Sequence, residues 1–487
     1  MPRSLSNPDL DPVPIEQRTW SEWNIAALWV GMAVCIPTYM LAASMITGGM
    51  RWWQALLTVM LGNLIVLVPM ILNAHGGTKY GIPFPVLARA SFGTKGAHIP
   101  SVARALVACG WFGIQTWIGG AAIYSIATVL GWISEDPEAS RMAFVGISPW
   151  QLACFGIFWI LHLVIVVRGI NSIKWLEAWA APFLIASGLA LLTWAIVRVD
   201  HFGDLFQNES GFKTRGEFWR VFFPQLTAMV GFWATLSLNI PDFSRYCKSQ
   251  RDQAVGQLLG LPTTMTLFCF IGIVVTGATI PIFGEAIADP IELVSRLDSK
   301  PVVVISLLAV LLATLSTNLA ANVVSPANGF ANVSPTRISF RTGAIVTCVI
   351  GVLIMPWRLY NDLGNYIFTW LIGYSALLGP IAGIIIADYF VLRRTRLDVG
   401  ALYDPDGKHA GVNGRAVLAL VLAVLPNVPG FINAATNTAG TDRAVFPPIF
   451  DTMYDYAWFI GIALAMLIYT GAMRGRATPH PAKEDRS

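Results

Sequence analysis

The stretch WNIAALWVGMAVCIPTYMLAASM, residues 23–45, decides the fold, because it is apolar and long enough to cross a membrane and yet is interrupted near its centre. Gly31 and Pro37 bracket the interruption. A proline removes a backbone donor and clashes with the carbonyl group four residues before it. In lipid every backbone polar group needs a partner, so such a break is tolerated only where the helix lines a cavity or packs against protein.

A second interrupted stretch is FFPQLTAMVGFWATLSLNIPDF, residues 222–243, with Gly231 at its centre and Pro241 near its end. Matched interruptions in two halves of a membrane protein indicate the binding site of a transporter. The alternative is that Gly and Pro are common in membrane helices whatever their role. The two stretches are the first and sixth apolar segments of the chain, five segments apart.

The composition indicates a membrane protein. Of the 487 residues, 55% are hydrophobic and 12% are charged, whereas a soluble domain carries about 25% charged residues. A soluble protein could not cover that much apolar surface, so a soluble enzyme, a fibrous protein and a disordered protein are excluded. The net charge of +4 gives no sign of a nucleic-acid partner. The expected partners are the lipid bilayer and a small molecule.

Twelve apolar segments predict an all-α polytopic membrane protein with twelve transmembrane helices. They are 24–46, 53–75, 100–131, 148–168, 172–197, 218–240, 255–283, 300–325, 341–356, 364–391, 416–433 and 450–473. The stretch 77–99 is too polar and too rich in Gly and Pro to span, and we expect a re-entrant or interfacial loop there.

The spacing of the two breaks predicts two five-helix repeats of opposite orientation, residues 24–197 and 218–391, followed by two trailing helices within 416–473. Lys and Arg are concentrated in alternate loops, which places both ends inside by the positive-inside rule. The segments 1–23 and 474–487 are therefore expected to be cytoplasmic. We expect a monomer in the inner (plasma) membrane, crossing it many times.

Two indoles and an amide lie at membrane depth. Trp111 and Gln115 are four residues apart in the third segment and share a helix face. Trp233 lies beside Phe232 in the break of the sixth segment. Two indoles facing one cavity could hold a flat ring by stacking, and Gln115 could bond its amide edge. The alternative for either Trp alone is a packing or lipid-facing role.

The eighth segment contains unusual polar groups. Asn318 and Asn322 lie on one helix face, where an unpaired amide is costly. Ser316 and Thr317 precede them, and hydroxyls of this kind often bond back to their own helix. Alternatively, two hydroxyls and a few carbonyl groups form an oxygen cage that suits Na⁺, since sites for hard divalent ions usually include carboxylates.

Several classes of function lack their signature residues. The sequence has no GxxxxGK[ST] loop for an ATP-driven pump, no ladder of arginines for a voltage sensor and no selectivity-filter motif. A membrane-embedded enzyme acting on ureides would need a metal cluster or a nucleophile with a base at mid-depth, and none is visible. A passive channel is distinguished by flux that does not saturate. We therefore expect a transporter without an organic cofactor.

Five runs of sequence resemble the nucleobase–cation symporter-1 family of purine, pyrimidine, allantoin and hydantoin permeases. They are NPDLDPVPIEQRTWSEWN (7–24), KYGIPFPVLARASFG (79–93), RALVACGWFGIQTW (104–117), STNLAANVVSPAN (316–328) and GPIAGIIIADYFVLRR (379–394). The similarity extends from about residue 7 to about 400. Within the family the chain looks most similar to bacterial allantoin permeases, with uracil permeases close.

The resemblance implies the leucine-transporter fold and cation-coupled uptake of a planar ureide or nucleobase by alternating access, with allantoin favoured and uracil or hydantoin next. It implies that Trp111 and Trp233 hold the ring while Gln115 and Asn322 bond its edge. The substrate set expected from sequence also contains Asn318, Phe232 and Cys35. The cation set that the family implies is Gly31, Val34, Ala313, Ser316 and Thr317.

Two positions depart from the family's hydantoin transporter. Cys35 stands where that protein has a Gln, and Phe232 stands where it has a Gly. The bulkier and drier wall is expected to change which ring fits. Members of the family differ between Na⁺ and H⁺ coupling, so a proton-coupled permease for cytosine, purines or another heteroaromatic ring is the alternative.

Overall fold

The computed structural model describes residues 5–474 apart from 135, 169, 200, 202, 204, 205, 207–209, 361–364 and 438–444. The described chain is helical and contains no strand. Its membrane-length helices and broken helices are α1 (Glu22–Ala33) with α2 (Ile36–Thr47), α3 (Trp52–Tyr80), α5 (His98–Val129), α6 (Pro149–Arg168), α7 (Ile170–Arg198), α8 (Arg215–Phe232) with α9 (Ala234–Asn239) and α10 (Pro241–Ser244), α11 (Gln250–Phe283), α13 (Lys300–Asn322) with α14 (Val324–Val333), α15 (Phe340–Leu353), η3 (Asn365–Leu371) with α17 (Ile372–Ile386) and η4 (Ala387–Leu392), α18 (Gly414–Val424) with η6 (Leu425–Asn427) and α19 (Val428–Asn437), and α20 (Ile449–Asp455) with α21 (Ala457–Met473). Shorter elements are η1 (Ile15–Gln17), α4 (Phe84–Phe92), α12 (Pro290–Ser295), α16 (Trp357–Tyr360) and η5 (Gly400–Leu402).

Each of the twelve expected segments coincides with one of these helices or broken helices, and the fold is that of a polytopic membrane protein with twelve transmembrane helices. Within the described residues, seven single helices are long and apolar enough to cross a membrane, and two bent pairs bring that number to nine. The other three segments contain α7, α8–α10 and α15. The helix α15 is only 14 residues long, and the α8–α10 segment is divided by its break.

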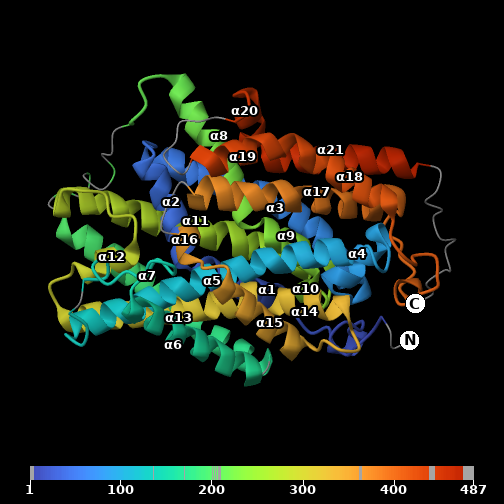
Figure 1. Ribbon diagram of the computed structural model, residues 1–487, viewed down its shortest axis with the longest axis horizontal. Coiled ribbons are helices and arrows are strands. Elements are labelled where there is room, and N and C mark those ends of the chain that lie inside the picture. Colours follow the sequence, from blue (N-terminus) through green and yellow to red (C-terminus); the bar gives the residue numbers. More distant parts are fainter. Residues whose placement is uncertain are drawn as a thin grey trace.

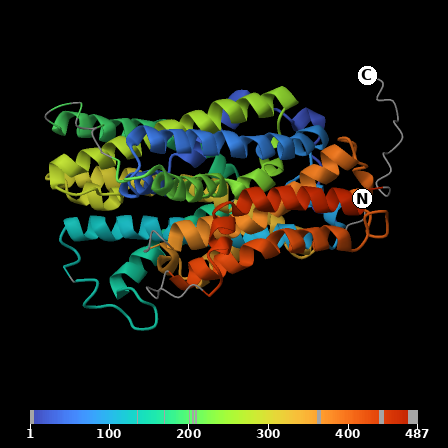
Figure 2. The ribbon, with the colours of Figure 1, turned by 90° about the horizontal axis from the view of Figure 1, so that it is seen from above.

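The helices run roughly parallel to the long axis of the molecule (Figures 1 and 2). The last helices of the chain, coloured orange to red, pack against one another on one side of the bundle, with α21 against α17 and α18. The two interrupted helices are more central. The helix α1 packs against α11 and α13, while α9 packs against α3 and α17.

Both breaks expected from the sequence are confirmed. The axes of α1 and α2 differ by 63°, and Val34 and Cys35 lie between the two helices. Pro37 falls in the first turn of α2, where a missing backbone donor has no cost. In the sixth segment, Trp233 separates α8 from α9. A side chain at Gly231 would approach the carbonyl oxygen of Leu371 to 2.9 Å, so glycine lets α8 lie directly against the tenth segment.

The stretch 77–99 is not the loop expected from its composition. The helix α3 continues to Tyr80, and the nine residues of α4 form a helix that is buried throughout. The backbone N–H of Phe84 donates to Asp242 Oδ1 at 3.0 Å, and the Arg89 guanidinium donates to Asn332 Oδ1 at 2.7 Å. The prolines occupy the first turn of α4, where they favour the helix rather than break it. The stretch forms a short buried helix that closes one end of the bundle.

The N-terminal residues lie at the same end of the bundle as α4. Asn7 Nδ2 donates to the carbonyl oxygen of Pro335 at 3.2 Å, Arg245 Nη1 donates to that of Asp9 at 2.8 Å, and Tyr403 Oη donates to that of Leu10 at 2.7 Å. The end of α21 lies on this side too (Figure 1). Loops rich in Lys and Arg are therefore gathered at one end, together with both ends of the described chain, as an even number of spans requires.

Candidate functional site

A small cavity of about 20 Å³ lies where the two breaks face α5 and α13. Six of the seven residues expected to bind substrate line it, whereas Asn318 does not. Thr317, expected in the cation set, lines it too. Sequence reasoning missed the four other lining residues, whose position at the cavity follows from the packing of the helices. The complete lining is Met32, Cys35, Trp111, Gln115, Phe232, Trp233, Thr235, Leu236, Thr317, Ala321 and Asn322.

Three aromatic rings form the wall of the cavity. Phe232 packs edge-to-face against Trp111, with ring centroids 5.2 Å apart, and against Trp233, at 4.9 Å. The two indoles were expected to face each other across an open space, and Phe232 instead contacts both of them. A planar six-membered ring is larger than the cavity in this conformation.

Two amide side chains reach the cavity from α5 and α13. The Gln115 side chain contacts the Cys35 thiol. Its Oε1 atom is buried and has no hydrogen-bond partner among the described residues. Asn322 is 5% exposed and donates through Nδ2 to Asn318 Oδ1 at 3.0 Å. An unpaired buried acceptor is costly, so Gln115 is suited to accept a hydrogen bond from a ligand.

Asn318 lies one layer behind the cavity. It is fully buried, and its Nδ2 atom is 3.1 Å from the carbonyl oxygen of Phe112 and 3.1 Å from His162 Nε2. Its i,i+4 spacing from Asn322 places both on one helix face, but Asn318 faces α5 and α6 instead of the cavity. Asn318 supports Asn322 and does not itself line the pocket.

The residues expected to hold a cation gather beside the α1–α2 break. Thr317 Oγ1 donates to the carbonyl oxygen of Gly31 at 3.0 Å, which joins α13 to the end of α1. Val34 packs with Ala313 in a small apolar cluster. The Ser316 hydroxyl is fully buried and has no partner among the described residues. Hydroxyl and carbonyl oxygens without a carboxylate fit a monovalent cation.

Arg104 is a buried cation that sequence reasoning left without a role. Its side chain is 1% exposed and connects α5 to the sixth and eighth segments. Nε donates to Asn239 Oδ1 at 2.7 Å and to the carbonyl oxygen of Thr235 at 3.2 Å, and Nη2 donates to that of Ala321 at 3.2 Å. Thr235 and Ala321 line the cavity. The signal in the sequence was an arginine at membrane depth, seven residues before Trp111 on the same helix.

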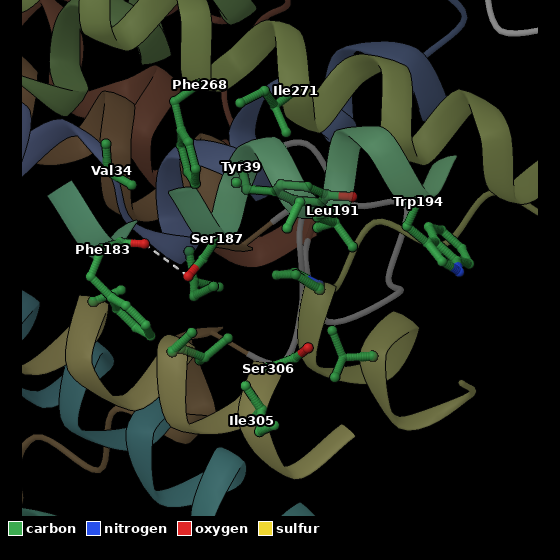
Figure 3. A pocket seen from close by; sticks show the side chains of 18 of the residues that line it. Val34, Tyr39, Phe183, Ser187, Leu191, Trp194, Phe268, Ile271, Ile305 and Ser306 are labelled. Atoms are coloured by element: carbon green, nitrogen blue, oxygen red, sulfur yellow. Dashed lines mark hydrogen bonds between the residues drawn. The ribbon is translucent and has the colours of Figure 1, made fainter. Parts of the chain in front are cut away.

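A larger cavity of about 260 Å³ lies on the other side of the α1–α2 break, between α2, α7, α11 and α13 (Figure 3). Side chains such as Phe268, Leu191 and Ile305 make its wall almost entirely apolar. Ser187 faces it, but its hydroxyl donates to the carbonyl oxygen of Phe183 at 2.9 Å. No amide side chain lines this cavity among the described residues. Its described lining offers hydroxyl groups, such as that of Ser306, but no amide to pair with the edge of a polar ring.

The twelve helices, the two breaks and the pocket between them define a class of protein, a secondary membrane transporter of the leucine-transporter fold with two inverted five-helix repeats and two extra helices. The chain belongs to the family of permeases for cytosine and purines, uracil, thiamine and allantoin, whose family model matches residues 12–461. It is a transporter and not an enzyme.

Two relatives illustrate the range of the family. A purine-uracil permease of Arabidopsis thaliana is 45% identical over 471 residues, which cover 96% of this chain and 77% of that protein. An allantoin permease of Bacillus subtilis (strain 168) is 37% identical over 474 residues, which cover 96% of this chain and 93% of that protein. The family resemblance stated from the motifs is thus confirmed, with both allantoin and uracil permeases among the relatives.

Solved structures agree with the fold. A transporter of the nucleobase-cation-symport-1 family, Mhp1, in a closed conformation with bromovinylhydantoin bound, matches with a TM-score of 0.78 and 28% identity and covers 97% of this chain and 96% of that one. A Na⁺-coupled sialic acid symporter matches with a TM-score of 0.63 at 13% identity, covering 95% of this chain and 92% of that one. The second likeness shows the fold alone.

Proposed function

We propose that this permease takes up a small cyclic ureide or nucleobase together with a cation, and that the ring binds in the cavity lined by Trp111, Trp233, Gln115 and Asn322. Allantoin is the favoured substrate, with uracil and hydantoin next. The observation that carries the proposal is the meeting of two indoles and two amides at both helix breaks. Stacking favours a flat ring, and the amides favour a ring with polar edges.

The proposed coupling follows from the position of the cation residues. Thr317 lines the ring cavity and also bonds Gly31 at the end of α1. A cation held by Gly31, Val34, Ala313, Ser316 and Thr317 would fix α1 against α13, and the ring would then stabilise the closed state. A ligand shifts such an equilibrium only by its difference in affinity between the two states, so cation and ring would each favour the closed state over the open one.

We also propose how the repeats and the two ends of the chain are arranged in the membrane. We assign the repeats to residues 24–197 and 218–391 and the trailing helices to 416–473. Concentration of Lys and Arg in the loops at one end supports a cytoplasmic position for both ends of the chain in the inner membrane. We propose that the monomer is the functional unit, because the cavity is completed by helices of a single chain.

Counterflow in liposomes tests the substrate. Purified protein is reconstituted, and entry of labelled allantoin, uracil, hydantoin, cytosine or adenine is measured against an internal excess of the same compound, with and without Na⁺. We expect saturable accumulation of at least one cyclic ureide. Flux that rises linearly with concentration and never exceeds equilibrium would indicate a channel. Accumulation of only cytosine or adenine would show that the substrate class differs from the one proposed.

Cation coupling gives a separate prediction. We expect Thr317→Ala and Ser316→Ala each to raise the Na⁺ concentration for half-maximal uptake by about 10-fold, the equivalent of about 1.4 kcal/mol of cation binding. Ser306→Ala is the matched control, because this serine lies on the same helix and lines the larger cavity. Uptake that does not depend on Na⁺ and is abolished by a protonophore would show that the coupling ion is H⁺.

A further inference from the structure

Behind the proposed ring site runs a chain of buried hydrogen bonds. His162 Nδ1 lies 2.9 Å from the carbonyl oxygen of Phe158, and His162 Nε2 lies 3.1 Å from Asn318 Nδ2. Asn322 Nδ2 donates to Asn318 Oδ1 at 3.0 Å. His162 and Asn318 are fully buried. The chain connects α6 to the cavity wall through α13.

The donor and acceptor roles along this chain are fixed at its His162 end, away from the cavity. A carbonyl oxygen only accepts, so His162 Nδ1 must carry the proton that it shares with Phe158. Nε2 then accepts from the Asn318 amide, and the imidazole is neutral. A second carbonyl oxygen, that of Phe112, lies 3.1 Å from Asn318 Nδ2 and also demands a donor. Thr116 Oγ1, which donates to the same Phe112 carbonyl oxygen, is a further acceptor 3.3 Å from Asn318 Nδ2. Three acceptors therefore hold the NH₂ group of Asn318 away from Asn322.

The consequence reaches the cavity. With its NH₂ group held in this way, Asn318 can offer Asn322 only an oxygen, and Asn322 must donate its own NH₂ group to it. Asn322 Oδ1 accepts no hydrogen bond from the described residues. Gln115 Oε1, on the opposite helix α5, is buried and also has no hydrogen-bond partner among the described residues. The two amides thus each present a carbonyl oxygen to a bound ring, so the ring meets two hydrogen-bond acceptors.

We propose that Asn318 is the positioning residue that sets the specificity of the permease, because it holds the Asn322 amide with its oxygen toward the ring and so selects substrates that offer an N–H group there. The inference rests on the proposed function, that this cavity binds the ring. The substrate class becomes cyclic ureides and imides with two unsubstituted ring N–H groups, such as the rings of uracil, hydantoin and allantoin. A ring that faces Asn322 with an unprotonated nitrogen or an N-alkyl group leaves the oxygen unpaired, which buried sites disfavour strongly.

The test compares methyl groups on nitrogen with methyl groups on carbon. Inhibition of labelled uracil counterflow is measured for uracil, 1-methyluracil, 3-methyluracil, thymine and 6-methyluracil, and inhibition of labelled hydantoin counterflow for hydantoin and its 1-, 3- and 5-methyl derivatives. Methylation of carbon adds the same bulk and keeps every N–H group. We expect at least one N-methyl compound in each series to bind about 5- to 150-fold more weakly than its C-methyl isomer, the cost of one unpaired buried acceptor.

The role of Asn318 is tested by measuring the same ratio of N-methyl to C-methyl affinities in a variant. In Asn318→Ala the Asn322 amide is free to rotate, and we expect the N-methyl to C-methyl ratio to fall to about 3-fold or less, since a rotated amide can offer its NH₂ group instead. A ratio of affinities does not depend on how much protein folds. If the variant yields no protein, the ratio measured for the wild type still tests whether the site requires ring N–H groups.

The outcomes separate the two proposals. If N-methyl and C-methyl isomers bind equally to the wild type, or if Asn318→Ala keeps the full ratio, the inference on Asn318 is wrong while ring binding stands. If none of allantoin, uracil and hydantoin is transported or competes for transport in the folded protein, the ureide assignment under the proposed function fails, and the inference fails with it.

Discussion

Replacing Trp111 with alanine is expected to weaken binding of a planar substrate by about 5- to 150-fold, because stacking of a base on an aromatic side chain is worth about 1–3 kcal/mol. Trp111 is 5% exposed and lines the cavity in the middle of α5. Its indole also packs edge-to-face against Phe232 at 5.2 Å. The substitution therefore removes one wall of the proposed ring site and the surface on which Phe232 rests.

The measurement is counterflow at several substrate concentrations, with protein abundance determined in the same vesicles. Trp132→Ala is the matched control, since Trp132 follows the end of the same helix and is 74% exposed. We expect the control to transport like the wild type. Unchanged half-saturation in Trp111→Ala, at normal abundance, would remove the indole from the ring site.

Replacing Arg104 with methionine is expected to destabilise the protein by about 2–5 kcal/mol and to abolish transport. The change leaves Asn239 Oδ1 and the carbonyl oxygens of Thr235 and Ala321 without their donor, and each buried unpaired acceptor costs about 1–3 kcal/mol. Lysine is expected to rescue only in part, since an ammonium group cannot reproduce the planar fork of the guanidinium. Thermal unfolding in detergent measures the loss.

An exposed arginine provides the control for that loss. Arg198 is 3.1 Å from Asp298, and the two side chains are 54% and 89% exposed. Arg198→Met should cost about 0–1 kcal/mol, as exposed ion pairs generally do. Equal melting temperatures for the two variants, with transport retained in Arg104→Met, would show that the buried guanidinium does not hold α5, α9 and α13 together.

Much of the architecture could be predicted from the sequence, because its causes are local. A proline such as Pro37 favours the first turn of a helix, where its missing backbone donor has no cost, and an apolar run of membrane length spans in almost any context. The i,i+4 spacing of Trp111 and Gln115 likewise put them on one face, and the structure brings both to the cavity. The same rule failed to distinguish Asn318 from Asn322, because the partners that hold Asn318 come from α5 and α6.

The remaining differences arise from tertiary packing. Phe232 contacts both indoles only because α8 ends where it meets α5, which no spacing in the sequence reveals. The buried helix α4 depends on Asp242 and Asn332, which are far away in the chain. Arg104 finds its acceptors on two broken helices. Each of these features is a contact between segments and not a property of either segment.

The size of the ring cavity determines how much water it can hold, and therefore whether protons or hydrated ions can pass through it. A volume of about 20 Å³ has room for about one water molecule, since a cavity needs roughly 10–15 Å³ to hold one. One isolated water cannot form a continuous file along which protons hop, nor can it carry a hydrated ion. In this conformation the ring cavity by itself therefore offers no water-filled route for protons or for a hydrated ion.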